Sequence, residues 1–283
     1  MLNEFAYRKG RTAQLGLRMY VALTWLTQGR DSIAGSWDRG PRPSAIAADP
    51  SLANAAVRHA MKYWCAWAAT TYEPDAFSPG IQINFYARQR PSDWPNLVSL
   101  YREVYDTLKT LRPGMQVSPT WQLDEMWKYG HWSLVPAFED KMDALALALY
   151  PGGYPGAGGS YTPDNLPADY IGHARTATGT TKPLVVSETG YGDSALASLG
   201  TPGSPELQRD YVAWLIRQAD SLGVAQVTWF FPTDPWGILD AMPPEQRGAF
   251  AFFGPMGMRK RTLAAKSALG VWDAAVARPY WRP

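Results

Sequence analysis

The run Val185-Val186-Ser187-Glu188-Thr189-Gly190 decides how the rest of this sequence is interpreted. It predicts an apolar strand whose C-terminal end carries a single carboxylate, with a glycine directly after it. A buried parallel strand that ends in a lone acid is how a (β/α)8 barrel presents a catalytic group at the mouth of its cleft. We therefore expect Glu188 to be a nucleophile at such a mouth, and the alternative is a glutamate that caps the next helix.

Outward from this run, apolar segments bounded by turn residues alternate with amphipathic stretches, a pattern typical of βα units around a parallel sheet. Leucines, tyrosines and valines at helical spacing predict a helix over residues 96–111. A second helix is expected over 205–222, with Ser204 as its N-cap and Gly223 just past its end. By the same tests, the expected strands cover residues 17–25, 80–86, 115–121, 144–150, 183–188 and 224–231.

Six expected strands are two fewer than a closed barrel requires, and the sequence opens with a helical segment at residues 3–14. We therefore predict an α/β fold, a (β/α)8 TIM barrel that lacks the first two βα units in this chain, or a barrel closed in an unconventional way. No low-complexity linker divides the sequence. Residues 1–283 are expected to form one catalytic-type (β/α) barrel domain.

Composition narrows the class of partner. The net charge of +2 is spread along the chain, which argues against nucleic acid, and no apolar stretch approaches the roughly 20 residues of a membrane span. Residues 1–10 do not resemble a secretory signal. The three histidines are scattered and the single Cys65 fits a core helix, so we expect no metal and no cofactor. We expect a monomer.

The aromatic content favours a carbohydrate ligand. The chain has 13 Trp and 15 Tyr, and sugar rings stack on flat apolar faces that have a polar edge. Among the polar residues past strand ends, Arg30 and Asp31 form a pair that could fix sugar hydroxyls, and Gln122 could bind another. A loop salt bridge is the alternative for that pair. The aromatic residues expected at or just after strand ends are Trp25, Trp121, Tyr150, Trp229 and Trp236.

Cleaving a glycosidic bond with retention requires a second carboxyl group about 5 to 5.5 Å from the nucleophile. The expected strand at 80–86 should supply it from the opposite side of the cleft. That strand carries Gln82 and Asn84, which are amides, and no acid.

Five runs, in order, carry a family resemblance: Gly80-Ile81-Gln82-Ile83-Asn84-Phe85-Tyr86, Val117-Ser118-Pro119-Thr120-Trp121-Gln122, Ala146-Leu147-Ala148-Leu149-Tyr150-Pro151, Val186-Ser187-Glu188-Thr189-Gly190 and Val227-Thr228-Trp229-Phe230-Phe231. They resemble strands four to eight of a clan A glycoside hydrolase, with arabinogalactan endo-β-1,4-galactanases and related bacterial barrel proteins as the nearest suggestion. The segment 17–31 resembles strand three and its loop.

This resemblance implies a retaining glycoside hydrolase that acts on a β-linked polysaccharide, with a galactan-like substrate as the first expectation. It implies that Glu188 is the nucleophile, that Gln82 occupies the acid/base position, that Asn84 lies in the substrate site and that Tyr150 hydrogen-bonds the nucleophile. It also implies an extracellular or periplasmic location, although the chain shows no signal peptide.

Glutamine at the acid/base position is a departure from the family, because an amide cannot donate or accept the proton that general acid catalysis transfers. Three explanations stay open: an engineered Glu-to-Gln change, a natural loss of activity, or the use of another acid such as Asp31 or Asp124. The alternative function is a catalytically impaired carbohydrate-binding pseudo-glycosidase. A barrel with unrelated chemistry is disfavoured, because no expected strand end carries Lys and no histidines cluster.

Overall fold

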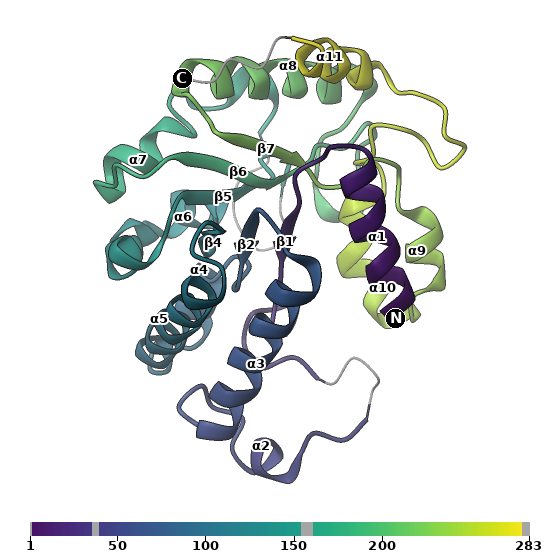
Figure 1. Cartoon of the computed structure of the whole chain (residues 1–283). Helices are drawn as coiled ribbons and strands as arrows, with labels where there is room; N and C mark the ends of the chain where they lie inside the picture. Colours follow the sequence, from purple (N-terminus) through teal and green to yellow (C-terminus); the bar gives the residue numbers. More distant parts are fainter. Residues whose placement is uncertain (1, 36–39, 154–160, 279–283) are drawn as a thin grey trace. The chain divides into compact units, whose positions relative to one another are not determined.

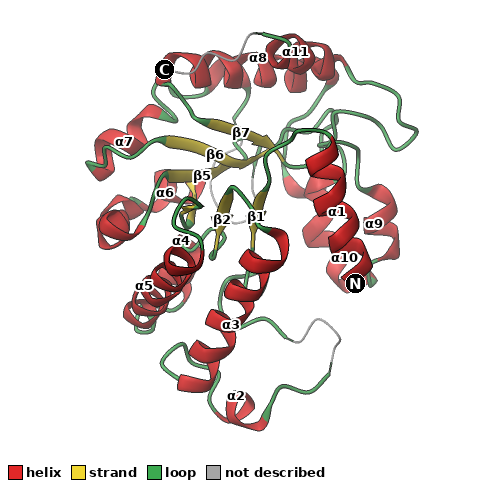
Figure 2. Cartoon of the chain, viewed as in Figure 1, coloured by secondary structure: helices red, strands yellow, loops and turns green. Residues whose placement is uncertain are grey.

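The computed structural model describes residues 2–35, 40–153 and 161–278. Their strands form two sheets, drawn as yellow arrows in Figure 2. The first has the order β1-β2-β3, with Tyr20–Ala22, Ala76–Ser78 and Gln116–Val117 paired in parallel. The second has the order β4-β5-β6-β7, made of Thr120–Gln122, Leu145–Leu149, Leu184–Thr189 and Gln226–Trp229, and β6 pairs with β7 in parallel.

Helices alternate with these strands along the chain, as the βα pattern predicts (Figure 1). The helix expected over residues 3–14 is present as α1. In the described part of the chain, no helix combines the length and the apolar character needed to cross a membrane. The α-helices are α1 Leu2–Gln14, α2 Ser44–Ala48, α3 Ala55–Tyr72, α4 Asn84–Gln89, α5 Trp94–Leu111, α6 Leu123–Tyr129, α7 Gly172–Thr178, α8 Pro205–Leu222, α9 Trp236–Ala241, α10 Pro244–Phe250 and α11 Ser267–Val276, and the 3-10 helices are η1 His131–Lys141, η2 Pro163–Asn165, η3 Ala197–Leu199 and η4 Ala251–Phe253.

The chain divides into two compact units, and each unit is built from separate stretches of sequence. Unit 1 comprises the described residues within Met1–Trp121, Ser133–Ala146 and Thr180–Lys182. Unit 2 comprises those within Gln122–Trp132, Leu147–Gly179 and Pro183–Pro283. The single domain expected over residues 1–283 stays a prediction.

In unit 1, the helices α3 and α5 pack against each other. Helix α3 begins where the Asn54 side chain accepts a hydrogen bond from the Ala56 N–H at 2.9 Å, which satisfies one of the donors that a helix start leaves unpaired. Helix α5 confirms the predicted helix over 96–111, because its buried side chains recur at helical spacing. Each fully buried aliphatic side chain contributes about 1.5–3 kcal/mol. These buried residues of α5 are Leu97, Leu100, Tyr101, Val104 and Leu108.

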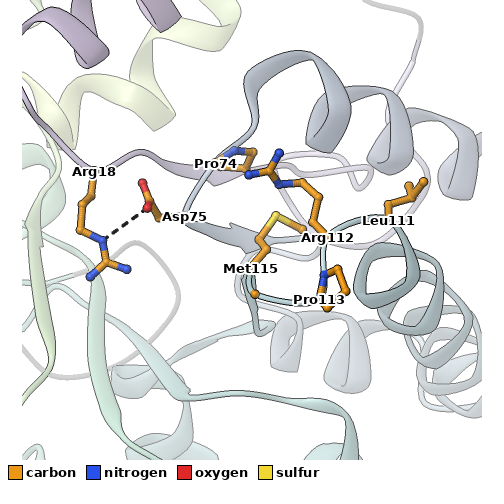
Figure 3. A pocket seen from close by; sticks show the side chains of 8 residues that line it. Arg18, Pro74, Asp75, Leu111, Arg112, Pro113 and Met115 are labelled. Carbon is orange, nitrogen blue, oxygen red and sulfur yellow. Dashed lines mark ion pairs between the residues drawn. The ribbon is translucent and has the colours of Figure 1, made fainter.

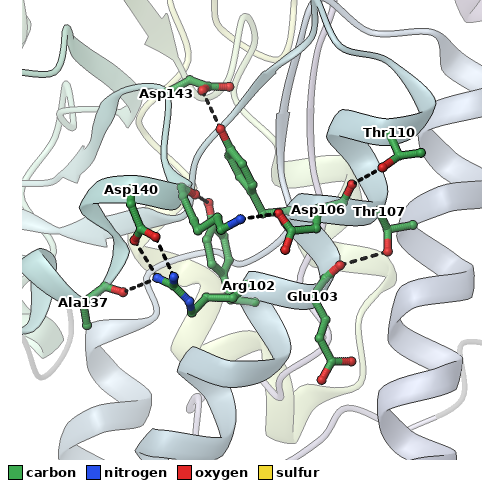
Figure 4. A network of polar contacts seen from close by, with 11 residues as sticks. Arg102, Glu103, Asp106, Thr107, Thr110, Ala137, Asp140 and Asp143 are labelled. Carbon is green, nitrogen blue, oxygen red and sulfur yellow. Dashed lines mark hydrogen bonds and ion pairs between the residues drawn. The ribbon is translucent and has the colours of Figure 1, made fainter.

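A polar network on the outside of unit 1 connects α5 to η1 (Figure 4). Arg102 donates two parallel hydrogen bonds of 2.6 Å to the two carboxylate oxygens of Asp140, and this contact lowers the pKa of Asp140. Lys141 of η1 pairs with Asp106 of α5 at 2.5 Å. Exposed ion pairs contribute little free energy, about 0–1 kcal/mol each. We infer that the network sets the position of η1 more than it stabilises the fold.

The strand β5, whose residues 147–149 belong to unit 2, is buried along its whole length, as expected for a strand covered on both faces. Helix α8 has the predicted bounds. It begins after Ser204, whose hydroxyl accepts a hydrogen bond from the Leu207 N–H at 3.1 Å, and it ends at Gly223, which takes a left-handed φ of 62°. Helices α8 and α11 lie side by side (Figure 1).

Four of the predicted strand ranges each overlap one observed strand, namely β1, β5, β6 and β7. The strand predicted over 80–86 is wrong: β2 ends earlier, at Ser78, before the Pro79-Gly80 turn, and α4 begins at Asn84. The range 115–121 holds two short strands, β3 and β4, rather than one. Pro119 lies between them and has no N–H for a strand ladder, which explains the interruption.

Candidate active site

The carboxylate of Glu188 lies at the C-terminal end of β6 in unit 2. The register between β6 and β7 pairs Val186 with Val227 and then Thr189 with Trp229, so β6 has one extra residue at this point. Such a bulge redirects a side chain at the end of a strand, and bulges are frequent beside active sites. The Glu188 side chain is half-buried there, so that water reaches part of it.

Tyr150, directly after β5, donates a hydrogen bond from its hydroxyl to Oε1 of Glu188. This is the contact that the family resemblance implies, and it links the ends of two strands. Thr189 holds these strand ends together, because its Oγ1 donates to the Leu149 carbonyl at 2.8 Å and lies 2.6 Å from the Tyr211 hydroxyl. A hydrogen bond to a carboxylate favours its charged form and fixes its orientation.

Asp124 holds Tyr150 in place, a role that the sequence did not indicate. Its Oδ2 accepts the Tyr150 backbone N–H at 2.8 Å and the Gln122 amide at 2.5 Å, and its Oδ1 accepts the Tyr170 hydroxyl. Asp124 is only 4% exposed, and this burial raises its pKa. From the sequence alone, Asp124 is an open candidate for a substitute acid. The structure corrects this, because the carboxyl group is buried and occupied by three protein donors.

The same contacts correct the expectation for Gln122. It is fully buried, and its amide donates to Asp124 where we expected it to bind a sugar hydroxyl.

An aromatic cluster surrounds the Tyr150 ring. Phe252 and Phe253 each meet it edge to face, with ring centroids 5.6 Å apart. Phe230, after β7, also approaches the ring at 80° and is 39% exposed. The sequence predicts Trp229 as the site aromatic of this run and gives no signal that favours Phe230 beside it. Because successive side chains of a strand point to opposite faces, Trp229 and Phe230 must lie on different faces of the sheet. The alternation does not show which of the two faces the site.

Trp229 itself packs among side chains of α8 and α11, including Val212 and Ala268, and its indole N–H donates to the Met256 carbonyl at 2.8 Å. Trp229 is half-buried among these helices, and its contact with a sugar stays a prediction. Trp236, at the start of α9, is half-buried and lies against Gly254, where an added Cβ would come within 2.3 Å of the indole. Its contact with a sugar stays a prediction.

In unit 1, Gln82 follows β2 and is 1% exposed. Its backbone N–H donates to Thr120 Oγ1 at 2.7 Å, and its side-chain Oε1 accepts a hydrogen bond from Arg30 Nη2 at 3.1 Å. Gln82 belongs to unit 1 and Glu188 to unit 2. The role of Gln82 opposite the nucleophile therefore rests on the sequence match alone and stays a prediction.

Arg30 is used by the protein itself rather than held ready for a ligand, which corrects the expectation that it fixes sugar hydroxyls. It is 9% exposed and donates to the carbonyls of Ile81, Thr27 and Gln28 as well as to Gln82.

Asp31 does not pair with Arg30. Its Oδ1 accepts the hydroxyls of Thr27 and Ser32 at 2.6 and 3.0 Å, and the Thr27 contact is the main cause of its lowered pKa. Asp31 is exposed, so its contact with a ligand stays a prediction.

Three further residues expected in the substrate site are buried. Trp25 is 3% exposed, Trp121 is fully buried with its ring edge to face against Phe138 at 5.3 Å, and Asn84 is fully buried at the start of α4. A ring without an exposed face cannot stack on a sugar, so Trp25 and Trp121 are core residues in this structure.

A buried lysine near the ends of β6 and β7 was also missed. The Lys266 side chain is 2% exposed, and its ammonium group lies 2.6 Å from Asp234 and 3.1 Å from Asp193. It also donates to the Pro255 carbonyl at 3.0 Å. Asp234 also accepts the Gly257 N–H at 2.8 Å. This ion triad connects the segments that follow β6 and β7, which only the fold brings together. Among the described residues, no three His, Cys, Asp or Glu side chains cluster as metal ligands would.

A pocket of about 330 Å3 lies at the other end of the unit 1 sheet (Figure 3). Its lining includes Arg18, Asp75 and Met115, which precede β1, β2 and β3. Active sites of α/β barrels lie at the C-terminal ends of the strands, so this pocket is at the wrong end for catalysis.

Comparison with known proteins places the fold. No family model matches the chain, and no curated protein sequence matches it. A family 5 glycoside hydrolase of subfamily 18 from Bifidobacterium longum, in complex with Manβ1-4GlcNAc, is similar over 99% of this chain and 66% of its own, with a TM-score of 0.66 and 14% identity.

Two further solved structures agree with this comparison. The family 53 catalytic domain from Ignisphaera aggregans matches 97% of this chain and 78% of its own, with a TM-score of 0.64 and 14% identity. A family 113 β-1,4-mannanase matches 98% and 80%, with a TM-score of 0.58 and 15% identity. The predicted resemblance is therefore confirmed for the fold: this chain has the α/β TIM-barrel fold of the clan A glycoside hydrolases.

Proposed function

We propose that the protein is a retaining glycoside hydrolase that acts on a β-linked polysaccharide, with Glu188 as its nucleophile and Gln82 at the acid/base position. The observation that carries this proposal is the hydrogen bond from Tyr150 to Glu188 at the ends of β5 and β6. A carboxylate held in this way, at the C-terminal ends of strands in a glycosidase fold, is suited to attack an anomeric carbon.

The chemistry sets which substrates can react. An oxygen of Glu188 forms a bond to the anomeric carbon while the bond from that carbon to the leaving oxygen breaks, and the leaving oxygen keeps the electron pair. A sugar leaving group needs a proton at this moment, which the amide of Gln82 cannot supply. A dinitrophenolate leaves as a stable anion. Activated aryl glycosides should therefore form the covalent glycosyl-enzyme even with glutamine at position 82.

Hydrolysis of the glycosyl-enzyme intermediate should also be slow. In a retaining enzyme the same acid/base residue deprotonates the water that hydrolyses the glycosyl-enzyme. We expect aryl glycosides to give a rapid release of about one equivalent of phenolate followed by a slow steady rate, because the adduct accumulates.

The test is labelling by 2,4-dinitrophenyl 2-deoxy-2-fluoro glycosides of galactobiose, mannobiose and laminaribiose, followed by peptide mass spectrometry. A galactan-like substrate is the first proposal. The panel includes the mannose sugar because similar structures include a β-1,4-mannanase, and the glucose sugar because another is a β-1,3-glucanosyltransferase. An adduct on Glu188 that is lost in Glu188→Gln supports the enzyme.

The second candidate function is a carbohydrate-binding pseudo-glycosidase, which Gln82 favours because the proton donor is missing. It predicts that the same sugars bind, by calorimetry, while no adduct forms on Glu188 over days. Binding without labelling would establish this alternative, and labelling would reject it.

We also propose that the protein is a monomer and that it acts outside the cytoplasm, where polysaccharides occur. Light scattering coupled to size-exclusion chromatography tests the first point, and fractionation of the source cells tests the second.

A further inference from the structure

Arg30 and Gln82 share an unusual backbone conformation. Their φ angles are 56° and 53°, in the left-handed region that residues with a side chain rarely adopt. One follows β1 and the other follows β2, so the two lie at the C-terminal ends of neighbouring parallel strands in unit 1. Left-handed residues of this kind persist only when their surroundings hold them, and they gather at functional sites.

The Arg30 guanidinium supplies much of that hold. Its Nε donates to the Ile81 carbonyl at 3.1 Å and its Nη2 to Gln82 Oε1 at 3.1 Å, while Nη1 donates to the Thr27 and Gln28 carbonyls at 2.9 and 3.1 Å. One side chain therefore ties its own loop to the turn after β2.

The direction of the Gln82 amide follows from hydrogen-bond chemistry. A guanidinium has only donors, so it can pair with the oxygen of a carboxamide and not with its NH2 group. The Gln82 backbone is fixed at the same time by the bond from its N–H to Thr120. Neither end of the residue can turn without breaking a bond.

We propose that Arg30 is a positioning residue that locks side chain 82 with its oxygen toward the guanidinium, and that it would hold a carboxyl group at this position as a charged acceptor instead of a proton donor. The lack of a general acid is then determined by both residues, Arg30 and Gln82. Replacing Gln82 alone would not recreate a general acid.

Two effects compete at a carboxyl group placed there. Burial disfavours the charged form, and a neighbouring guanidinium favours it. The guanidinium should prevail because it is itself buried and, within the described ranges, its contacts are neutral carbonyl and amide oxygens. A carboxylate at position 82 would neutralise this charge, whereas a neutral carboxyl group would leave it unpaired. Asp124 shows the opposite case: burial raises its pKa, and the hydrogen bonds from its neutral donors lower the pKa too little to offset that effect.

The experiment is a titration of Gln82→Glu followed by NMR of glutamate labelled with 13C at Cδ, with the new signal identified by comparison with the unmodified protein. We expect its pKa to lie at least about one unit below the ordinary 4.3 of glutamate. A pKa at or above that value would overturn the proposal. This readout needs neither a sugar nor any activity.

A second pair of variants assigns the effect to Arg30. In Gln82→Glu/Arg30→Met the pKa of the new carboxyl should rise by more than about two units relative to the single variant, because burial then acts alone. The control is Gln82→Glu/Arg90→Met. Arg90 donates to the Asp31 carbonyl in the same loop, so its loss removes an equal charge nearby and should leave the pKa low. An equal rise in both double variants would refute the specific contact.

Activity measurements separate this inference from the proposed function, on which the NMR result does not depend. On a responsive polysaccharide, Gln82→Glu should gain less than about tenfold, and the Arg30→Met double variant should gain more. A low pKa in a protein that neither binds nor labels any sugar would uphold the positioning role and reject the glycosidase. If the double variant does not fold, the single-variant titration still decides.

Discussion

Replacing Tyr150 by Phe removes one hydroxyl and leaves the ring that packs against Phe252 and Phe253. The lost contact is a hydrogen bond to a half-buried carboxylate, Glu188, and hydrogen bonds to charged groups contribute about 1.5–3 kcal/mol. If that bond orients the attacking oxygen in the transition state, the rate of covalent labelling should fall by about tenfold to about 150-fold, since about 1.4 kcal/mol corresponds to a factor of ten.

The assay is the second-order rate of inactivation by the fluoro glycoside, measured together with thermal unfolding. Tyr191→Phe is the matched control, because Tyr191 is a buried tyrosine of the same unit whose hydroxyl donates at 3.0 Å to the backbone carbonyl of Tyr161. Tyr150→Phe should lose about 1.5–3 kcal/mol of stability, and Tyr191→Phe, whose hydroxyl donates to a neutral carbonyl, about 0.5–1.5 kcal/mol. Only Tyr150→Phe should label slowly. An unchanged labelling rate in that variant would refute the role given to the hydroxyl.

Three further outcomes are expected. Asp124→Asn should lower the free energy of unfolding by about 1–3 kcal/mol in urea titrations, because an amide cannot accept from all three buried donors. The control Asp164→Asn, at an exposed position, should change the free energy of unfolding by less than about 0.5 kcal/mol. Equal effects of the two variants would refute the role given to Asp124. Lys266→Met should cost about 3–5 kcal/mol, because it leaves two carboxylates without their shared cation, and a loss below 1 kcal/mol would show that the triad is incidental. Burial raises the pKa of Cys65 to about 12, above its value in the unfolded chain. The stability that the buried thiol contributes is therefore present below the unfolded pKa and is lost as the pH rises toward 12. A disulfide reagent at pH 8 should modify the denatured protein and spare the native one.

Helix α8 and the strands β5 and β6 could be predicted because their signals are local. Ser204 and Gly223 mark the two ends of α8, and a continuous apolar run marks β5. The contact between Tyr150 and Glu188 followed from the resemblance, which placed both at strand ends in the correct order.

Other parts depended on information that one sequence does not hold. Isoleucines alternate with polar residues from Ile81 to Asn84, a pattern that predicts a strand, but the turn there is held by Arg30, some 50 positions earlier in the chain. The burial of Trp25 and Trp121 could not be predicted either, because a strand-end aromatic fits the core or the cleft equally well until the facing elements are known.

Because β6 has one extra residue relative to β7, the number of residues in β6 determines where the Glu188 side chain points. Upstream of the extra residue, side chains alternate in step with β7, and downstream the alternation is displaced by one position. Deleting Ser187 would restore uniform pleating and should swing the carboxylate of the following residue to the opposite side of the sheet. Any attempt to transplant this segment into another barrel must therefore copy its residue count as well as its acid.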